Sequence, residues 1–493
     1  MELLGYVFVL HVNFLNQTCM EFAAHQFLVV ALVCRHWKIV AYSTPAIWNT
    51  PDFMFPTLAR NMLHRSKSTP LNIVWTPSCR HERVDRDAQD KVFMEAAKQT
   101  SRIASLDLSS ASHNVAALFN STWSTMTGAA PLIHTIRIRC YSSLVDNFDG
   151  VIPDEFLAGQ APRLANLCLE GCSLSWRSPL LKNLTTLSIK CPPVALRPQI
   201  RVVVDALRSL RSLATLDLRH CISPVSLSDH PSGKILAFPF LQQLVLSVES
   251  RPCLSLLQCM WFPDTAAIHL SCWEPLPDLP VNRLFSYVAN LMAPAATTPS
   301  HPRAIRELAL IEEASVTIIA RNTNNSNSPS ALDTDETPQL RLHVRAHHFG
   351  RAATIKSLSG LIPSMHLENL RIDCRDPFPR EALVQLLEKS RLLKSLIIQD
   401  HISLDFVQLL KTQEAFLPAL RTLTLDSVNF GIYPTPDPAP FIQSLKHRSE
   451  GGSPLEVLVL VDCTGIYSND IEEVQKWVDR LSWNGLFLTG KRI

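Results

Sequence analysis

Glycine is scarce in this sequence, with 14 residues among 493, and this scarcity limits the binding sites that the chain can build. Phosphate loops need glycines where the backbone approaches a ligand closely, so a nucleotide site of that class is not expected. The sequence also lacks a nucleophile elbow, a paired metal-binding motif and the kinase signature set. We therefore expect a protein that is not an enzyme, with no catalytic residues, no metal site and no cofactor.

Charge of one sign is not in excess either, because 46 Lys and Arg residues face 44 Asp and Glu residues and leave a net charge of +2. Such a chain has no overall field that attracts nucleic acid or an anionic membrane. No apolar run reaches the roughly 20 residues that span a bilayer. The apolar start, MELLGYVFVLHVNFLNQ, lacks a basic leader and a clean cleavage site, which favours a buried helix over a signal peptide. We expect neither nucleic acid nor a membrane as a partner.

Cysteine occurs 13 times, an odd number, and is spread along the chain rather than concentrated as in small secreted scaffolds. This distribution favours reduced thiols and a cytoplasmic or nuclear location. A secreted repeat receptor is an alternative, and it requires the N-terminus to be a signal sequence.

A leucine repeat organises the sequence downstream of the first hundred or so residues. Three segments, at 164–172, 213–221 and 455–463, read L-x-x-L-x-L-x-x-C, and shorter relatives are LTTLSIKC, LENLRIDC and IHTIRIRC. The L-x-L alternation places two side chains on one face of a short strand, and a cysteine is small enough to be buried in the following turn. We therefore expect the cysteines that end these motifs to be buried: Cys140, Cys172, Cys191, Cys221, Cys374 and Cys463.

Helical patterns separate these strands. RVVVDALRSL, VNRLFSYVANLM, PREALVQLLEKSR and SLDFVQLLKT repeat apolar residues at steps of three and four. Strand, turn and helix recurring at intervals of roughly 20 to 40 residues is the leucine-rich-repeat pattern. The polar segment 321–338 is the clearest insertion and is expected to be a disordered loop. We predict an α/β fold in which residues 101–493 form an irregular leucine-rich-repeat solenoid.

The x positions of the L-x-L strands are expected on the curved inner face of this domain, and either this face or its loops would hold a binding partner. They include Cys168, Ser188, Asp217, Val245, Arg371 and Thr424. Three histidines, His343, His347 and His348, have no carboxylate or cysteine at ligand spacing, which favours a solvated face over a metal site.

Residues 25–42, HQFLVVALVCRHWKIVAY, have the apolar spacing of one helix. Its apolar face is expected to carry Val29, Val33, Trp37 and Val40. A residue before proline disfavours helical backbone, so the helix is expected to end near Ser43, ahead of Pro45. Trp37 and Trp48 are expected to hold the N-terminal helices together.

These residues resemble the F-box of fungal F-box proteins that carry leucine-rich repeats. The family pattern has Leu-Pro before E-[LI]-L-x-x-[IV]-F, then V-C-[RK]-x-W-[RK], then S-T-P-x-[LI]-W. The matching stretches here are ELLGYVF at 2–8, VCRHWK at 33–38 and STPAIW at 43–48. The Leu-Pro is absent, so the first helix is expected to be truncated. LHRSKSTPLNIVW at 63–75 is similar to a stretch that follows the box.

The resemblance implies a short all-helical F-box at residues 1–50, followed by a linker at 51–100 that we expect to be helical. F-box proteins dock on the Skp-type adaptor of a cullin-RING ubiquitin ligase, and their repeats present a substrate. The resemblance assigns adaptor binding to Leu3, Leu4, Val7, Phe8, Val29, Val33, Trp37, Pro45 and Trp48. The expected function is substrate recognition in an SCF-type ligase, with an unknown protein substrate. The alternative is a leucine-rich-repeat scaffold with a degenerate F-box and no ligase role.

Overall fold

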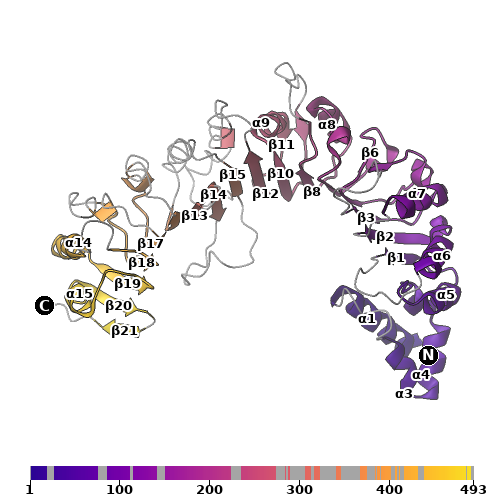
Figure 1. The fold of residues 1–493 in the computed structure, drawn as a ribbon, viewed down its shortest axis with the longest axis horizontal. Helices are drawn as coiled ribbons and strands as arrows, with labels where there is room; N and C mark the ends of the chain where they lie inside the picture. Colours follow the sequence, from indigo (N-terminus) through magenta and orange to yellow (C-terminus); the bar gives the residue numbers. More distant parts are fainter. Residues whose placement is uncertain are drawn as a thin grey trace. The chain divides into compact units, whose positions relative to one another are not determined.

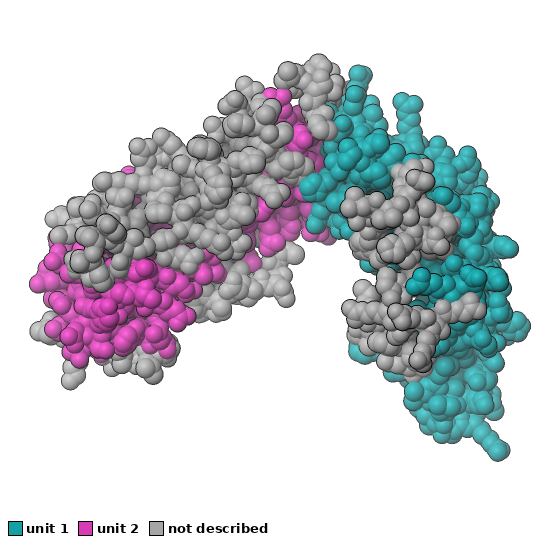
Figure 2. Space-filling view, viewed as in Figure 1, with its two compact units in different colours: residues 1–241, 259–262 teal, residues 242–258, 263–493 magenta. Residues whose placement is uncertain are grey.

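The structure is a computed structural model of the chain. It describes residues 2–18, 27–75, 86–110, 115–140, 150–223, 235–273, 306–312, 316–321, 340–345, 367–374, 390–400, 416–430, 438–484 and 486–489, with single helical residues near 284–288, 384–388 and 406–410. The chain divides into two compact units (Figure 2): unit 1 comprises residues 1–241 and 259–262, and unit 2 comprises residues 242–258 and 263–493.

The N-terminal part of unit 1 is helical, and we call it the helical module. Its elements are α1 (Glu2–Thr18), η1 (Phe27–Val29), α3 (Val30–Val33), α4 (Arg35–Ser43) and η2 (Pro45–Trp48). Phe8, Val40 and Trp48 are central to its buried core. Gly5 lets α1 approach α4 closely, because a Cβ at that position would lie 2.9 Å from Thr44 Oγ1.

The single helix expected over residues 25–42 is wrong, because the backbone breaks at Cys34. This residue is extended, with φ −159° and ψ 169°, and its Sγ accepts a hydrogen bond from the Trp37 amide at 3.4 Å. The thiol therefore acts as the N-cap of α4 and starts a new helix. Val29 and Val33 lie before the break and Trp37 and Val40 after it, so the four residues do not form one helical face. The helix ends at Ser43, as the proline predicted.

A strand lies in the range 51–100, which we expected to be helical. The range contains α5 (Pro56–Arg65), β1 (Leu71–Trp75) and α6 (Arg86–Ala97), followed by η3 (Thr100–Arg102). β1 alternates buried and less buried residues and pairs in parallel with β2 (Ile103–Ser110). The Asn72 amide donates to the Asn49 carbonyl at 2.8 Å, so the end of the helical module covers the outer edge of β1.

The sheet of unit 1 has only parallel neighbours along its described length, in the order β1-β2-β3-β5-β7-β8. The remaining strands are β3 (Thr135–Cys140), β5 (Asn166–Glu170), β7 (Thr186–Lys190) and β8 (Thr215–Arg219). The helices α5, α6, α7 (Val115–Thr125) and α8 (Ile200–Leu207) lie on one side of these strands (Figure 1). Alternate residues such as Leu106, Ile136 and Leu167 face that side and are buried.

A recurrent turn follows the strands that carry the repeat motif. The residue after the strand has a positive φ in five cases: Gly171, Cys191, His220, Ser427 and Asp462. In the longer motif the cysteine comes one residue later, and Cys172 and Cys221 pack inward and are fully buried. Cys463, which was expected to be buried too, is only partly buried, and the burial of Cys374 lies outside the described residues. In LTTLSIKC the motif is one residue shorter, and Cys191 itself takes the turn position. The expectation that Cys191 is buried is therefore wrong, because its side chain is exposed.

Short elements connect the strands of unit 1. They are β4 (Val151–Ile152), η4 (Phe156–Gly159), β6 (Ser173–Leu174), η5 (Pro179–Leu181), η6 (Val194–Leu196), β9 (Leu236–Ala237) and β11 (Met260–Trp261). β4 pairs with β6 and β9 pairs with β11, both in parallel.

The sheet of unit 2 is mostly parallel. Its strands are β10 (Gln243–Glu249), β12 (Ala267–Trp273), β13 (Glu307–Glu312), β14 (Val316–Arg321), β15 (Leu340–Arg345), β16 (Asn369–Cys374), β17 (Ser395–Asp400), β18 (Thr422–Asp426), β19 (Leu455–Val461), β20 (Val478–Trp483) and β21 (Leu486–Thr489). β14 is antiparallel to both β13 and β15, and β21 is antiparallel to β20. The helices of this unit include α9 (Ser250–Cys259), α14 (Ala439–Glu450) and α15 (Ser468–Val474).

The molecule is therefore an α/β protein with a large, mostly parallel sheet and helices. Arg321, the first residue of the expected insertion, ends β14, and residues 322–338 lie outside the described part of the chain. Most of the expected helices near 282–292, 380–392 and 403–412 lie outside it too. Among the described residues, no helix combines the length and apolar character needed to cross a bilayer.

Candidate docking and recognition surfaces

One face of α1 exposes apolar side chains. Leu3, Tyr6, Val7 and Leu10 follow the three- and four-residue steps of a helix, and Leu3 is 81% exposed. The opposite face buries Phe8 and Val12 in the core of the helical module. α1 is thus apolar on both faces, whereas a helix on the surface of a protein normally has a polar outer side.

The segment η1–α3 adds three more exposed apolar residues. Val29 is 61% exposed, Leu32 82% and Val33 57%, while Val30 and Ala31 between them are buried. We call the seven exposed residues the apolar patch: Leu3, Tyr6, Val7 and Leu10 of α1, with Val29, Leu32 and Val33 of η1–α3. So many exposed apolar side chains on one small helical module are typical of a site of interaction.

The residues assigned to adaptor binding fall into two groups in the structure. Leu3, Val7, Val29 and Val33 are exposed, whereas Phe8 and Trp48 are each only 2% exposed. Leu4, Trp37 and Pro45 are partly buried. The rings of Phe8 and Trp37 lie 5.1 Å apart, and Trp48 Nε1 donates to the Ala41 carbonyl at 3.0 Å. Phe8 and Trp48 therefore lie in the core of the module, where Trp48 links η2 to α4, and little of either side chain is exposed to a partner.

Three residues of the apolar patch were not identified from the sequence. Tyr6, Leu10 and Leu32 lie between motif positions of the family pattern, so the resemblance does not select them. Tyr6 and Leu10 share a helical stripe with Leu3, but the sequence does not show which stripe of α1 is exposed, and Leu32 lies next to Val33 rather than one helical turn away.

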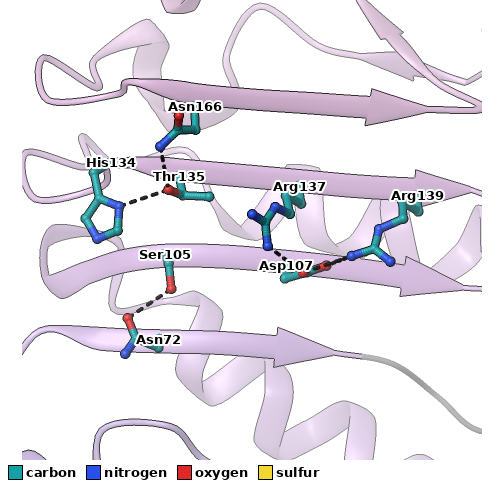
Figure 3. A network of polar contacts seen from close by, with 8 residues as sticks. All are labelled: Asn72, Ser105, Asp107, His134, Thr135, Arg137, Arg139 and Asn166. Carbon is teal, nitrogen blue, oxygen red and sulfur yellow. Dashed lines mark hydrogen bonds and ion pairs between the residues drawn. The ribbon is translucent and has the colours of Figure 1, made fainter. Parts of the chain in front are cut away.

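A second candidate surface is the open face of the unit 1 sheet, on the side away from the helices (Figure 3). The register aligns the outward residues of successive strands in three rows across the sheet. The first row is Asn72, Ser105, Thr135, Asn166, Thr186 and Thr215. The second row is Val74, Asp107, Arg137, Cys168, Ser188 and Asp217. The third row is Ser109, Arg139, Glu170, Lys190 and Arg219. Cys168, Ser188 and Asp217, which were expected on one face, are direct neighbours in the second row.

Hydrogen bonds connect the first row across the strands. Ser105 Oγ donates to Asn72 Oδ1 at 2.9 Å, and Asn166 Nδ2 donates to Thr135 Oγ1 at 3.2 Å (Figure 3). His134 Nδ1 lies 2.9 Å from the same Thr135 oxygen. These bonds hold the polar side chains in fixed positions on the face.

Two aspartates organise the charges of the other rows. Asp107 binds Arg139 Nη2 through both carboxylate oxygens, at 3.0 and 3.1 Å, while Arg137 Nη1 lies 3.9 Å away (Figure 3). Asp217 binds Arg219 Nε at 2.8 Å and Lys190 Nζ at 3.3 Å. Burial raises the pKa of Asp107 above its ordinary value, although the two arginines act to lower it. The face presents an ordered, mixed-charge surface that is suited to binding a protein.

The expected face residues of unit 2 are less alike in their surroundings. Val245 is buried, at 8% exposure, as are Ser188 and Asp217 in the second row of the unit 1 face, at 7% and 8%. Arg371 and Thr424 share a row through Ile397, and Arg371 Nη2 donates to Gln399 Oε1 at 2.9 Å. His343 Nδ1 lies 2.8 Å from Thr317 Oγ1, and His347 and His348 lie outside the described residues.

The cysteines and the other possible metal ligands form no metal site within the described part of the chain. Among those residues, no three His, Cys, Asp or Glu side chains lie close enough together to hold a metal ion. Burial raises the pKa of the Cys168 thiol, and it raises that of Cys221 to about 12. The geometry therefore supports binding at two surfaces. Comparison with known proteins adds no relative, because the chain matches no protein-family model and no curated protein.

Proposed function

We propose that this protein is a substrate-recognition subunit of an SCF-type cullin-RING ubiquitin ligase. In this proposal the helical module is an F-box that docks on a Skp-type adaptor. The sheet-containing remainder is an irregular leucine-rich-repeat solenoid that binds the target protein. The motif stretches at 2–8, 33–38 and 43–48 supply the resemblance on which the proposal depends.

The observation that carries the proposal is the apolar patch. Its residues are exposed, while the motif residues Phe8 and Trp48 form the core of the module. A docking module needs both: buried residues that hold it folded and exposed residues that contact the partner. Fully burying a Val or Leu side chain contributes roughly 1.5–3 kcal/mol, so covering several of them would support a stable complex. Large apolar anchors at the centre of an interface usually dominate its binding energy.

The proposed mechanism is proximity rather than chemistry. Docking through the apolar patch would hold the chain on the ligase, and the open faces of the sheet would hold the substrate. Tethering in this way raises the effective concentration of the substrate near the ubiquitin-loaded enzyme. The substrate itself is bound through polar rows such as the one containing Asp107 and Arg137.

Co-purification with a Skp-type adaptor tests the proposal. The variant Leu3→Glu/Val7→Glu/Val33→Glu changes only exposed positions, so it is expected to fold but to lose the adaptor. The matched control is Val194→Glu, because Val194 is 71% exposed and lies outside the helical module. The unmutated chain and the control are both expected to retain the adaptor.

Two results would count against the proposal. If the unmutated chain fails to capture the adaptor, the scaffold alternative with a degenerate box is favoured instead. If the triple variant binds as well as the unmutated chain while thermal unfolding shows that both are folded, the apolar patch is not the docking surface.

A further inference from the structure

Positive charge is concentrated in residues 27–75, from η1 to β1. Residues 27–75 contain five basic side chains, Arg35, Lys38, Arg60, Arg65 and Lys67, against a single acidic one, Asp52. This segment carries a net charge of +4, from five minus one, whereas the whole chain carries +2. The Arg60 charge is neutralised by Glu95, whose carboxylate accepts two hydrogen bonds from it at 3.0 and 3.1 Å.

Two of these cations lie over one aromatic side chain on α4. The Arg65 guanidinium, from α5, lies 4.1 Å from the centre of the Tyr42 ring and 5.2 Å from that of Trp48. Lys38 Nζ lies 5.7 Å from the Tyr42 ring centre. Arg35 is exposed and lies three residues before Lys38 and seven before Tyr42, on the same face of α4. We call this surface the basic aromatic face: Arg35, Lys38 and Tyr42 of α4 with Arg65 of α5.

The position of the Arg65 guanidinium over the Tyr42 ring is consistent with a cation–π contact. A guanidinium that lies flat on a ring is fixed in position, and its planar N–H groups point sideways rather than into the ring. Among the residues that the structure describes, no acidic side chain pairs with Arg35, Lys38 or Arg65. The face therefore presents three cations, Arg35, Lys38 and Arg65, whose charge no described acidic side chain neutralises.

We propose that the basic aromatic face binds a carboxylate-rich surface of the Skp-type adaptor, as a second contact besides the apolar patch. This inference rests on the proposed function. Carboxylates match the bidentate geometry of a preorganised guanidinium, and opposite charges across an interface speed association and select the partner.

The surroundings of the two aromatic rings and the few exposed apolar residues of α4 favour a carboxylate-rich protein over nucleic acid or a membrane. Binding of single-stranded nucleic acid generally uses open aromatic faces for stacking, but the Arg65 guanidinium already lies over the Tyr42 ring and Trp48 is buried. A membrane-binding helix needs a broad apolar face, and the exposed side of α4 offers only Ile39 besides Tyr42.

The test compares adaptor binding by the unmutated chain and by Arg35→Gln/Lys38→Gln/Arg65→Gln, at about 50 and about 300 mM salt. We expect the variant to bind about tenfold more weakly at the lower salt concentration and to lose most of the salt dependence. The control, Arg163→Gln/Arg177→Gln/Lys182→Gln, removes three exposed cations elsewhere in unit 1 and is expected to bind as the unmutated chain does. Arg35→Gln/Lys38→Gln alone, which leaves Arg65 in place, is expected to show a smaller loss in the same direction.

The outcomes separate this inference from the proposed function. If the variants bind the adaptor with unchanged affinity and salt dependence, the inference is overturned and the proposed function stands. If the unmutated chain does not bind the adaptor, the proposed function and this inference are both overturned. A labelled ten-residue glutamate peptide then measures the chemistry of the face itself, and tighter binding of duplex DNA or of anionic vesicles than of this peptide contradicts carboxylate recognition.

Discussion

At the scale of single residues, Gly171 shows how closely neighbouring strands approach at the recurrent turn. Its φ is +69°, and a Cβ there would lie 2.0 Å from the Cys140 carbonyl oxygen. Gly171→Ala is expected to lower the free energy of unfolding by about 2–5 kcal/mol, from left-handed strain plus overpacking. Gly452→Ala is the control, because φ is +79° but no atom lies within 4 Å of the added carbon. Urea unfolding that shows equal losses for both variants would contradict this account.

The Cys34 thiol is expected to contribute to stability as a helix cap. Cys34→Ala removes the acceptor of the Trp37 amide and is expected to cost about 1 kcal/mol, whereas Cys34→Ser supplies a preferred N-cap oxygen and preserves stability. Amide hydrogen exchange within α4, together with urea unfolding, measures the difference. Equal protection of α4 in the two variants would mean that the cap is not stabilising.

Buried thiols make the chain sensitive to alkaline pH. Burial raises the pKa of Cys221 to about 12, above the value of about 8.5 for a thiol in an unfolded chain. Below about pH 8.5 the thiol is protonated in both states and its contribution to stability is complete. As pH rises toward 12, the unfolded thiol ionises while the folded one does not, so the free energy of unfolding falls by up to about 1.4 kcal/mol per pH unit.

Cys221→Ala is expected to remove this part of the pH dependence. Urea unfolding of the variant and of the unmutated chain at about pH 8 and about pH 10 measures it. Cys191→Ala, at an exposed position, is the control and is expected to keep the dependence. A pH dependence that is the same in Cys221→Ala and in the unmutated chain would contradict the assignment.

At the scale of elements, Arg448 of α14 fastens the turn before β18. Its guanidinium donates to the carbonyls of Phe416, Leu417 and Leu420 at 2.7, 2.7 and 3.1 Å. Burial lowers the pKa of Arg448 to about 10, so the group is still charged at neutral pH. Arg448→Met is expected to cost about 3 kcal/mol, since three carbonyls lose a charged donor.

The control for Arg448 is Lys446→Met on the same helix. Lys446 is half exposed and contacts Glu450 at 4.0 Å, so its loss is expected to cost less than about 1 kcal/mol. Hydrogen exchange of the β18 amides reports whether the turn loosens. Similar exchange rates in the two variants would show that Arg448 does not hold the turn.

The leucine motif located many strands but not all of them. Each complete motif lies on a strand, as at β5, β8 and β19, because L-x-L alternation after a leading leucine fits one buried face. β1, β12 and β15 were missed, since LNIVW, AIHLSCW and LRLHVR alternate without that leading leucine. The exposed and buried sides of α1 were not predictable from its pattern either, because the helix is apolar on both faces.

The turn chemistry explains the other errors at this scale. A cysteine at the end of a motif reads the same in sequence whether it follows the left-handed turn or occupies it. Cys221 follows the turn and is buried, while Cys191 occupies it and is exposed. At Cys34, the apolar spacing continued across a residue whose side chain capped a new helix, so periodicity alone joined two helices into one.

At the scale of the whole molecule, the helical module protects the sheet of unit 1. Asn49 bonds the outer edge of β1, and unprotected strand edges readily pair with other chains. Deleting residues 1–50 is therefore expected to cause aggregation, measured by size-exclusion chromatography. The patch variant Leu3→Glu/Val7→Glu/Val33→Glu keeps the edge covered and is expected to stay monodisperse, so aggregation of both would attribute the effect to the apolar patch instead.

The row register of the open face separates what keeps the fold from what meets a partner. In β7, Leu187 and Ile189 carry the core, while Thr186, Ser188 and Lys190 each supply one position to a different row. Ser188 is only 7% exposed, so substitutions at the partly exposed Thr186 and Lys190 are the ones expected to change the surface and leave the framework unchanged. Recognition in such a protein can diverge one strand at a time over evolution, so two chains that share every core leucine need not share a target.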